Sequence, residues 1–400
     1  MRGGISALMA SILVVLVVAS AAPVRAGEGI VVAHSYLVIA SRPAASDWPS
    51  RIERLEVARG GRVVDVVATG DVLGGSWAPD GSLVAWTSEV SGALFVARRD
   101  GSGKRTVVPA NALCDRNRCS SVSYDWAPRG HRLVVGGLAG GSRVEVIDAA
   151  TGRTKNATPR PDGAYSVSRW LPSGLIAYTK EGGNPELYTV VVARRDGSHP
   201  RTLSPEFDDR GDFGAVSLSP DGRRLLVITR GGRTEVYSIV DVASGESHRL
   251  KTVPGTVPVQ WDISGWANNG RIAFTTRSGG RERVMTVGVD GAGPRTLITL
   301  NKGEWLYAVL GSPNGQRVAL TVATGTRVRL ITVGIDGRGV RTLLAAKAKD
   351  VGGLRWWRDG DLTIVRGRKL LEGRDKPVSL ARIVYATPPG FDSIDSYDRR

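Results

Sequence analysis

The chain has very little cysteine and histidine, two residue types that often bind transition metals. Its 400 residues include two Cys and four His, and the His are far apart, at His34, His131, His199 and His248. A structural zinc site needs four such ligands at short spacings, but the two Cys have no further Cys and no His near them. The sequence therefore disfavours a zinc site, and we expect neither a metal nor a cofactor.

Long apolar runs are also scarce. The run at residues 12–19 (ILVVLVVA) is well short of the roughly 20 residues that span a membrane. Arg2 precedes it, and residues 24–26 (VRA) follow with the small residues of a signal-peptidase site. No Cys follows the run, which disfavours a lipoprotein anchor. We predict a signal peptide over 1–26 and a mature domain over 27–400 that is periplasmic, wall-associated or secreted. Retention of the first segment as an anchor is the alternative.

The two cysteines, Cys114 and Cys119, lie in the segment NALCDRNRCSSV. In an oxidising compartment outside the cytoplasm, two thiols five positions apart favour one disulfide that closes a small loop. A redox-active pair usually has two residues between its cysteines, whereas four separate them here. The sequence predicts a structural Cys114–Cys119 bridge, with a free redox pair as the alternative.

Acidic residues are fewer than basic ones. The chain has 54 Lys and Arg against 38 Asp and Glu, a net charge of +16, or +14 without Arg2 and Arg25 of the signal peptide. The basic residues are mostly Arg, are scattered and do not cluster with aromatic residues, so nucleic acid is not an expected partner. A protein, or an anionic envelope component such as phospholipid or wall polymer, is the expected partner. A basic surface with no dedicated ligand is the alternative.

One short phrase is abundant. It first occurs as SWAPDGSLVAWTS at residues 76–88. Related copies begin at six later positions: Asp125, Arg169, Ser217, Gly265, Gly311 and Arg355. When they are aligned on Pro79 of the first copy, successive copies are 44 to 49 residues apart. A period of this length is typical of the four-stranded blades of a β-propeller.

Each copy has the pattern of a strand, a tight turn and a second strand. Pro sets φ at the start of the turn, Asp bonds to the backbone two residues on, and Gly accepts the reversed φ. The strand after the turn is apolar on both faces, as at residues 83–86 (LVAW) and 225–228 (LLVI). Such a strand belongs in a sheet packed between two others, which is the arrangement of neighbouring propeller blades.

A second turn follows the third predicted strand of each repeat. Four copies contain Asp-Gly, and in each an Arg-Thr pair comes five residues after the Asp: Asp100, Asp196, Asp290 and Asp336. Asp-Gly between two β-rich runs predicts a hairpin. We interpret the Arg that begins the outer strand as a charge that protects an edge strand from pairing with other chains.

The two ends of the sequence predict how the ring closes. Residues 36–40, 52–57 and 62–67 resemble the last three strands of a repeat whose first strand is missing. The segment 392–397 (DSIDSY) resembles a first strand, SVSYDW at 121–126. We therefore predict an all-β fold, a single β-propeller of about eight four-stranded blades whose ring is closed by the C-terminal tail. Seven blades with a terminal segment packed outside is the alternative.

The phrase SPDG followed by Leu at residues 219–225, repeated at blade length behind a predicted signal peptide, resembles the TolB-like family of β-propellers with WD40-like repeats. The resemblance covers essentially the whole mature chain and implies a fold rather than a function. TolB itself carries an α/β domain ahead of a six-bladed propeller and docks to a peptidoglycan-associated lipoprotein. This chain has no room for that domain and has more repeats, so we do not expect it to be TolB itself.

Catalytic motifs are absent from the sequence. The G-x-S-x-G of many serine hydrolases does not occur. The segment RRDGSGKRT at 98–106 lacks the first Gly and the Ser or Thr of a phosphate-binding loop. In propeller lyases that resemble this fold, His residues gather around a metal in the central channel. The four scattered His could converge there, but surface His at strand ends or turns is the preferred interpretation.

Five of the ten Trp share one position, at the end of the first strand of a repeat: Trp77, Trp126, Trp170, Trp266 and Trp356. Aromatic rings at one repeat position could line a carbohydrate-binding channel. Packing between neighbouring blades explains the same spacing without a ligand, and we prefer that interpretation.

Recognition is expected in the loops that interrupt the repeat. The clearest is the cysteine loop, residues 111–120, in which the bridge would hold out Asp115, Arg116 and Arg118. We predict a non-catalytic, exported, monomeric scaffold that binds a protein or an envelope polymer. A carbohydrate-active or lyase-type propeller enzyme with its site in the central channel is the alternative.

Overall fold

The computed structural model describes strands and turns over most of the chain after residue 35. The described residues are 36–43, 52–59, 62–88, 91–110, 114–115, 118–119, 123–137, 143–158, 165–181, 187–204, 206–208, 216–231, 234–250, 265–278, 281–347, 351–356, 361–366, 369–374, 382–386 and 391–399. Every regular element in these ranges is a β-strand, which confirms the all-β prediction. The predicted signal peptide lies outside them, and within them no helix is long and apolar enough to cross a membrane.

The first sheet has seven strands in the order β34-β1-β2-β3-β4-β5-β6. It consists of two four-stranded units that share β3, because β3 pairs with β2 along its first part and with β4 near its end. The sequence predicted two separate strands here, an outer strand at 62–67 and a first strand that ends at Trp77, whereas β3 is one continuous strand of 16 residues. The strands of this sheet are β1 (Tyr36–Pro43), β2 (Ile52–Arg59), β3 (Arg62–Trp77), β4 (Leu83–Thr87), β5 (Leu94–Arg98), β6 (Arg105–Val108) and β34 (Phe391–Arg399).

Six antiparallel sheets follow within the described residues, each built from four strands consecutive in the chain. The first three contain β9 (Ser123–Trp126), β10 (Arg132–Gly137), β11 (Arg143–Asp148) and β12 (Thr154–Asn156); β13 (Tyr165–Trp170), β14 (Ile176–Glu181), β15 (Leu187–Ala193) and β16 (Arg201–Thr202); and β18 (Val216–Leu218), β19 (Arg224–Gly231), β20 (Thr234–Asp241) and β21 (Ser247–Arg249). A short fifth strand, β17 (Phe207–Asp208), pairs with β15 in the second of these sheets.

The remaining three sheets repeat the same pattern. They contain β22 (Gly265–Asn268), β23 (Arg271–Ser278), β24 (Arg281–Gly288) and β25 (Arg295–Thr299); β26 (Glu304–Gly311), β27 (Arg317–Thr324), β28 (Arg327–Gly334) and β29 (Arg341–Lys347); and β30 (Val351–Trp356), β31 (Asp361–Arg366), β32 (Lys369–Arg374) and β33 (Arg382–Ala386). A separate two-stranded sheet pairs β7 (Cys114–Asp115) with β8 (Arg118–Cys119).

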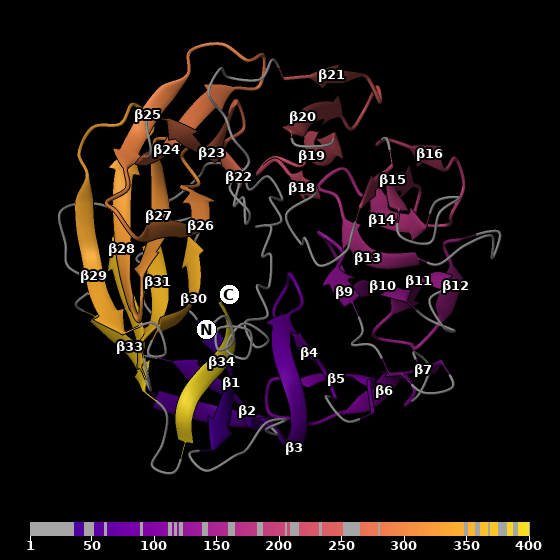
Figure 1. Cartoon of the computed structure of the whole chain (residues 1–400). Coiled ribbons are helices and arrows are strands. Elements are labelled where there is room, and N and C mark those ends of the chain that lie inside the picture. The colour runs from indigo at the N-terminus through magenta and orange to yellow at the C-terminus, as the bar shows by residue number, and fades with distance from the viewer. Residues whose placement is uncertain are drawn as a thin grey trace, which may run out of the picture.

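The sheets succeed one another around a common centre (Figure 1), with the first strand of each nearest the centre and the fourth toward the rim. This is the architecture of a β-propeller, as the repeat predicted. The C-terminal strand β34 pairs antiparallel with β1, with Val38 opposite Asp398. The tail therefore lies beside the first strand of the described chain, as expected. The number of blades and the closure of the ring stay predictions.

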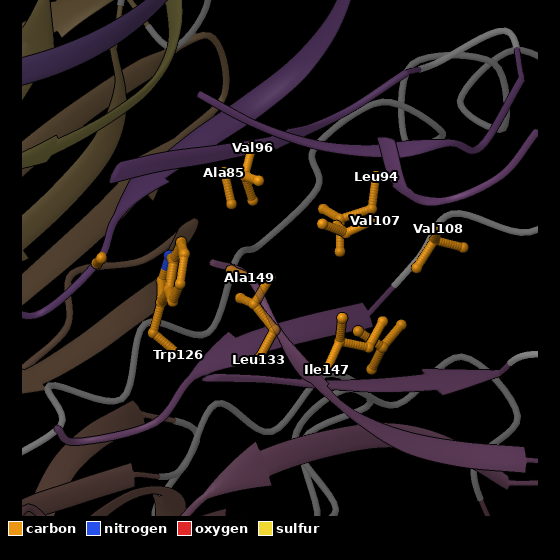
Figure 2. Packing of buried hydrophobic residues seen from close by; sticks show 11 residues of the cluster. Ala85, Leu94, Val96, Val107, Val108, Trp126, Leu133, Ile147 and Ala149 are labelled. Atoms are coloured by element: carbon orange, nitrogen blue, oxygen red, sulfur yellow. The ribbon is translucent and has the colours of Figure 1, made fainter. Parts of the chain in front are cut away.

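The hydrophobic core lies between neighbouring sheets. In β4, the consecutive residues Val84 and Ala85 are both fully buried, and they pack in different clusters. Because successive side chains of a strand point to opposite faces, each faces a different neighbour. Figure 2 shows the cluster that contains Ala85, in which Ala85 and Leu94 of one sheet pack against Leu133 and Ile147 of the next. Packing between two neighbouring sheets explains why strands such as β4 are apolar on both faces.

The direction of the strands divides the molecule into two ends. Neighbouring strands are antiparallel, so the turn between strands one and two of a sheet (the inner turn) and the turn between strands three and four (the outer turn) lie at the same end. We call this the turn end. The links between strands two and three, and from one sheet to the next, lie at the opposite, loop end. The repeated phrase forms the inner turns.

Candidate functional site

The predicted cysteine loop is built around the β7–β8 pair. Cys114 lies directly opposite Cys119 in this pair, and Asp115 lies opposite Arg118. Opposed residues of antiparallel strands have Cα atoms about 4.5–5.5 Å apart, which is within the range that a disulfide bridges. The backbone register supports the predicted bridge, which stays a prediction. Arg116 lies outside the described residues.

The cysteine loop belongs to the loop end. It connects β6, the fourth strand of one unit, with β9, the first strand of the next. Such links between sheets lie opposite the turns formed by the repeated phrase. The structure therefore places Asp115 and Arg118 opposite each other on a link that departs from the repeat. This link lies at the opposite end of the molecule from the inner turns.

Asp and Asn side chains of the inner turns accept hydrogen bonds from the same turn and so stabilise its conformation. Asp80 Oδ1 accepts hydrogen bonds from the Ser82 backbone N–H at 3.0 Å and from Ser82 Oγ at 2.8 Å. Asn314 Oδ1 accepts one from the backbone N–H of Gln316 at 3.1 Å in the same way. An Asx turn of this kind needs an acceptor oxygen but no charge. The most frequent acidic position of the repeat is therefore structural.

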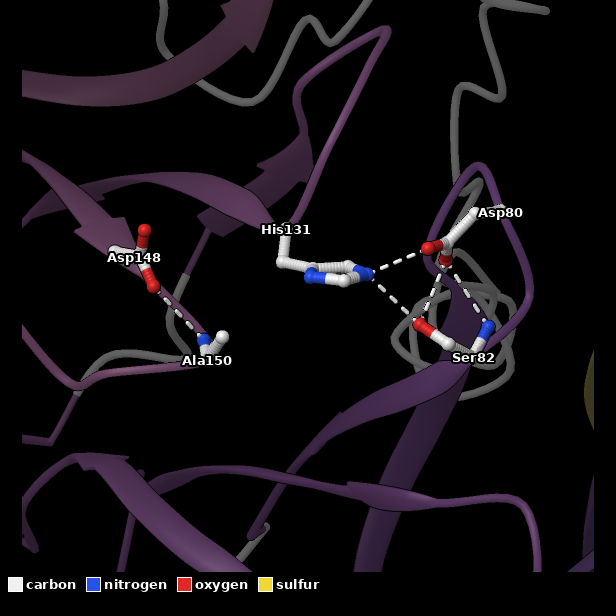
Figure 3. A network of polar contacts seen from close by, with 5 residues as sticks. All are labelled: Asp80, Ser82, His131, Asp148 and Ala150. Atoms are coloured by element: carbon white, nitrogen blue, oxygen red, sulfur yellow. Dashed lines mark hydrogen bonds and ion pairs between the residues drawn. The ribbon is translucent and has the colours of Figure 1, made fainter.

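Two neighbouring inner turns bring Ser, His and Asp together (Figure 3). His131 Nε2 lies 2.5 Å from Asp80 Oδ2 and 2.8 Å from Ser82 Oγ. In a catalytic triad the Asp binds one ring nitrogen and the Ser binds the other, so that a proton can pass through the ring. Here both partners contact the same nitrogen. The arrangement links two neighbouring inner turns and does not have the geometry of a nucleophile with its base.

Asp80 is held as a carboxylate by these contacts. Its partial burial raises its pKa, but the hydrogen bonds from Ser82 and the contact with His131 outweigh that effect, and the pKa is lower than the ordinary value of 3.8. The His131 side chain is 33% exposed and that of Asp80 is 47% exposed. A pair this accessible to water is a surface contact between turns.

Several fourth strands in the described part of the chain contact the outer turn of the next sheet. Arg201 donates hydrogen bonds to the carbonyl oxygens of Ala243 at 2.7 Å and Val242 at 2.6 Å. Arg105 donates to the Ala150 carbonyl, and His248 Nε2 lies 2.7 Å from the Val289 carbonyl oxygen. The Arg of the Arg-Thr pair was interpreted as edge protection. In two of the four copies, at Arg105 and Arg201, the structure gives it a more specific role, as a bond between neighbouring sheets.

The described His residues do not converge. His131 lies in an inner turn, His248 in a fourth strand, and His199 in an outer turn with φ of 55°. These positions at turns and strand ends agree with the sequence prediction; His34 lies outside the described residues. In the part of the chain that the structure describes, no three His, Cys, Asp or Glu side chains group so that they could hold a metal ion.

The five Trp at the common repeat position are all buried, with exposures between 5% and 7%. Trp126 packs with Ala85 and Val96 of the preceding unit, and its Nε1 donates to Ser76 Oγ at 3.1 Å. Trp266 Nε1 donates to the Ser217 carbonyl of the preceding sheet at 3.1 Å. These contacts confirm that the Trp residues pack between sheets.

No protein-family model and no curated protein matches this sequence, but solved structures match the fold. Dihydro-heme d1 dehydrogenase NirN is 14% identical over 91% of this chain and 74% of its own, with a TM-score of 0.58. Puromycin hydrolase is 17% identical over 81% of this chain and 55% of its own, with a TM-score of 0.52. TolB from Acinetobacter baumannii is 18% identical over 65% of this chain and 62% of its own, with a TM-score of 0.38.

The matches to NirN and puromycin hydrolase, with TM-scores above 0.5, agree with the β-propeller architecture and show a distant structural similarity. The chain spans little more than half of puromycin hydrolase and 62% of the TolB structure. At such low identity the likeness concerns the fold alone. Enzymes occur among the matched structures, so the fold by itself does not decide between binding and catalysis.

Proposed function

We propose that the protein is a non-catalytic, exported β-propeller that binds a protein partner or an anionic component of the cell envelope. One observation carries the proposal. In the part of the chain that the structure describes, Asp side chains of the turns are hydrogen-bonded within them, and His131 contacts Asp80 and Ser82 of the neighbouring turn. Basic residues outnumber acidic ones in the chain, 54 to 38.

The proposal assigns the protein partner to the cysteine loop. Asp115 and Arg118 are opposed across the β7–β8 pair, and the predicted bridge would hold this hairpin rigid. A rigid charged hairpin at a link that departs from the repeat is suited to recognition. Attraction between such exposed charges and a partner weakens as salt is added.

The test is partner capture in cells that export the protein, by crosslinking and identification of the captured component. Charge reversal at the loop, Arg116→Glu with Arg118→Glu, is expected to lower capture at least tenfold. The matched control, Arg295→Glu with Arg341→Glu, makes the same charge change at the exposed first residues of β25 and β29 and is expected to leave capture within twofold. Equal losses from the two pairs would show that the cysteine loop is not the recognition element.

The enzyme alternative makes a different prediction. If the purified protein turned over a polysaccharide, and substitution of one of the four His abolished that turnover, the non-catalytic proposal would be wrong. The four residues to substitute are His34, His131, His199 and His248. Turnover that survives all four changes would point to a contaminating enzyme.

A further inference from the structure

Positive charge is concentrated in a group of outer turns at the turn end. The outer turn after β5 contains the sequence RRDG at 98–101, and the one after β15 contains RRDG at 194–197. Between them along the chain lies the outer turn after β11, which contains Arg153. We call the four exposed residues Arg98, Arg153, Arg194 and Arg195 the basic arc.

The three turns of the basic arc are connected in space. Arg105 of β6 donates a hydrogen bond to the Ala150 carbonyl in the second turn. Lys155 Nζ of β12 lies 4.0 Å from Asp196 Oδ2 in the third turn. Each fourth strand thus touches the next outer turn, so the Arg residues of three successive sheets lie along one stretch of the turn end. In the linear sequence, nearly a hundred residues separate the first from the last.

The carboxylates of these turns accept hydrogen bonds from their own turns, and Asp196 also forms an ion pair with Lys155. Asp100 Oδ1 accepts a hydrogen bond from the Ser102 backbone N–H at 2.9 Å, and Asp196 Oδ1 accepts one from Ser198 Oγ at 2.6 Å. Asp148 Oδ1 accepts from the backbone N–H of Thr151 at 2.8 Å. Asp100 and Asp196 are exposed as well and offset part of the positive charge. The segments 98–105, 148–155 and 194–201 nonetheless contain nine Lys and Arg against three Asp, so these turns stay strongly basic.

The turns that carry the Arg residues contain many small residues. The segments between them consist mainly of small residues, Gly101 to Gly103 in the first turn and Ala150 to Gly152 in the second. The Asx hydrogen bonds hold these turns in one conformation. A partner that is itself flat can therefore approach all three turns within the roughly 10 Å over which exposed charges interact at moderate salt.

We propose that the basic arc binds the phosphate groups of an anionic phospholipid membrane. Guanidinium groups bind phosphate oxygens in a paired geometry, and cations spread over three neighbouring turns match a plane of headgroups better than one protein epitope. This inference rests on the proposed function, because it takes the anionic envelope component to be lipid. With the turn end on the membrane, the loop end and its cysteine loop are directed away from the membrane.

The test uses the mature full chain and vesicles of phosphatidylcholine with or without phosphatidylglycerol in a flotation assay. We expect binding only to the vesicles that contain phosphatidylglycerol, and loss of that binding at high salt. Replacing the basic arc (Arg98→Gln, Arg153→Gln, Arg194→Gln and Arg195→Gln) is expected to weaken binding by roughly tenfold or more, since each cation near an anionic surface contributes appreciably. Far-UV dichroism checks that this variant is folded.

The matched control removes the same number of charges from the loop end: Arg281→Gln, Lys302→Gln, Arg327→Gln and Lys347→Gln. All four residues are exposed, and we expect binding within twofold of the unaltered protein. Equal losses in the two variants would show that net charge, not the arc, is responsible and would overturn the inference. So would wild-type binding to a soluble polyanion but not to vesicles. Partner capture through the cysteine loop would persist in either case. Failure of the lipid inference can therefore be distinguished from failure of the proposed function.

Discussion

Gly197 shows why the second residue of the Asp-Gly turn has to be glycine. Its φ of +76° is in the left-handed region, which side chains with a Cβ rarely adopt. A Cβ at this position would also lie 2.6 Å from the carbonyl oxygen of Ala157 in the preceding sheet. The glycine therefore permits both the turn and the close approach of two sheets.

We expect Gly197→Ala to lower the free energy of unfolding by about 2–4 kcal/mol, the sum of left-handed strain and a steric clash with backbone. Gly174→Ala is the matched control, because Gly174 has a similar φ of +82° and open space where its Cβ would be. The control should cost only about 1–2 kcal/mol. Urea unfolding measures both, and equal costs would contradict the close approach of the sheets.

Some residue roles could be predicted from sequence and others could not. The five Trp were predicted to pack because they recur at one position of the repeat. The contact of His131 with Asp80 joins two copies of the repeat about fifty residues apart. Nothing in either copy specifies the other as its partner. Such contacts depend on how neighbouring sheets are placed, which a single repeat does not contain.

At the scale of the strands, the repeat predicted the regular sheets well and the exceptions poorly. Strands β4 and β19 lie where the apolar runs placed them. The long strand β3 was not foreseen, because its sequence passes through Gly70, which has a φ of +86° and is typical of a turn. Strand β17 was also missed, since two residues carry too little periodicity to indicate a strand.

The pairing of β34 with β1 makes the C-terminal tail part of the first unit. Deleting the chain after Pro389 would remove β34 and expose the edge of β1. We expect the melting temperature to fall by roughly 5 °C or more, because an unpaired edge loses a row of hydrogen bonds and packing. Removing Arg400 alone leaves β34 whole and should change little. An unaltered melting temperature in the longer deletion would favour seven blades and a dispensable tail.

At the scale of the whole molecule, the fold gathers charges that the sequence disperses. The Arg residues of 98–101 and 194–197 are nearly a hundred positions apart in the sequence. Antiparallel pairing sends both segments to the turn end, and contacts between successive sheets align them. The repeated RRDG string was a visible clue. The sequence alone does not show that all outer turns share one end of the molecule. The basic arc was therefore not predicted as a recognition element, whereas the cysteine loop was.

The turn carboxylates also link the stability of the molecule to pH. A hydrogen bond from the Ser244 backbone lowers the pKa of Asp241 below 3.8. For Asp148, burial raises the pKa, but hydrogen bonds from Thr151 outweigh it, so this pKa is lowered as well. A group whose pKa is lower in the folded state stabilises the protein above its unfolded pKa, and the contribution is lost as the pH falls through the folded pKa. Protonation also increases an already large positive charge, which favours expansion.

We therefore expect the melting temperature to be nearly constant between neutral pH and about pH 5, and to fall steeply below about pH 4. Replacing Asp148 and Asp241 together by Asn keeps an acceptor oxygen in both turns, as Asn314 does naturally. This variant should be slightly less stable at neutral pH, because its acceptors are neutral, and should lose less stability on acidification. Thermal melts over this pH range measure the difference. If the variant and the natural chain lose stability equally between pH 5 and the acid limit, the turn carboxylates do not set the acid response, and general charge repulsion does.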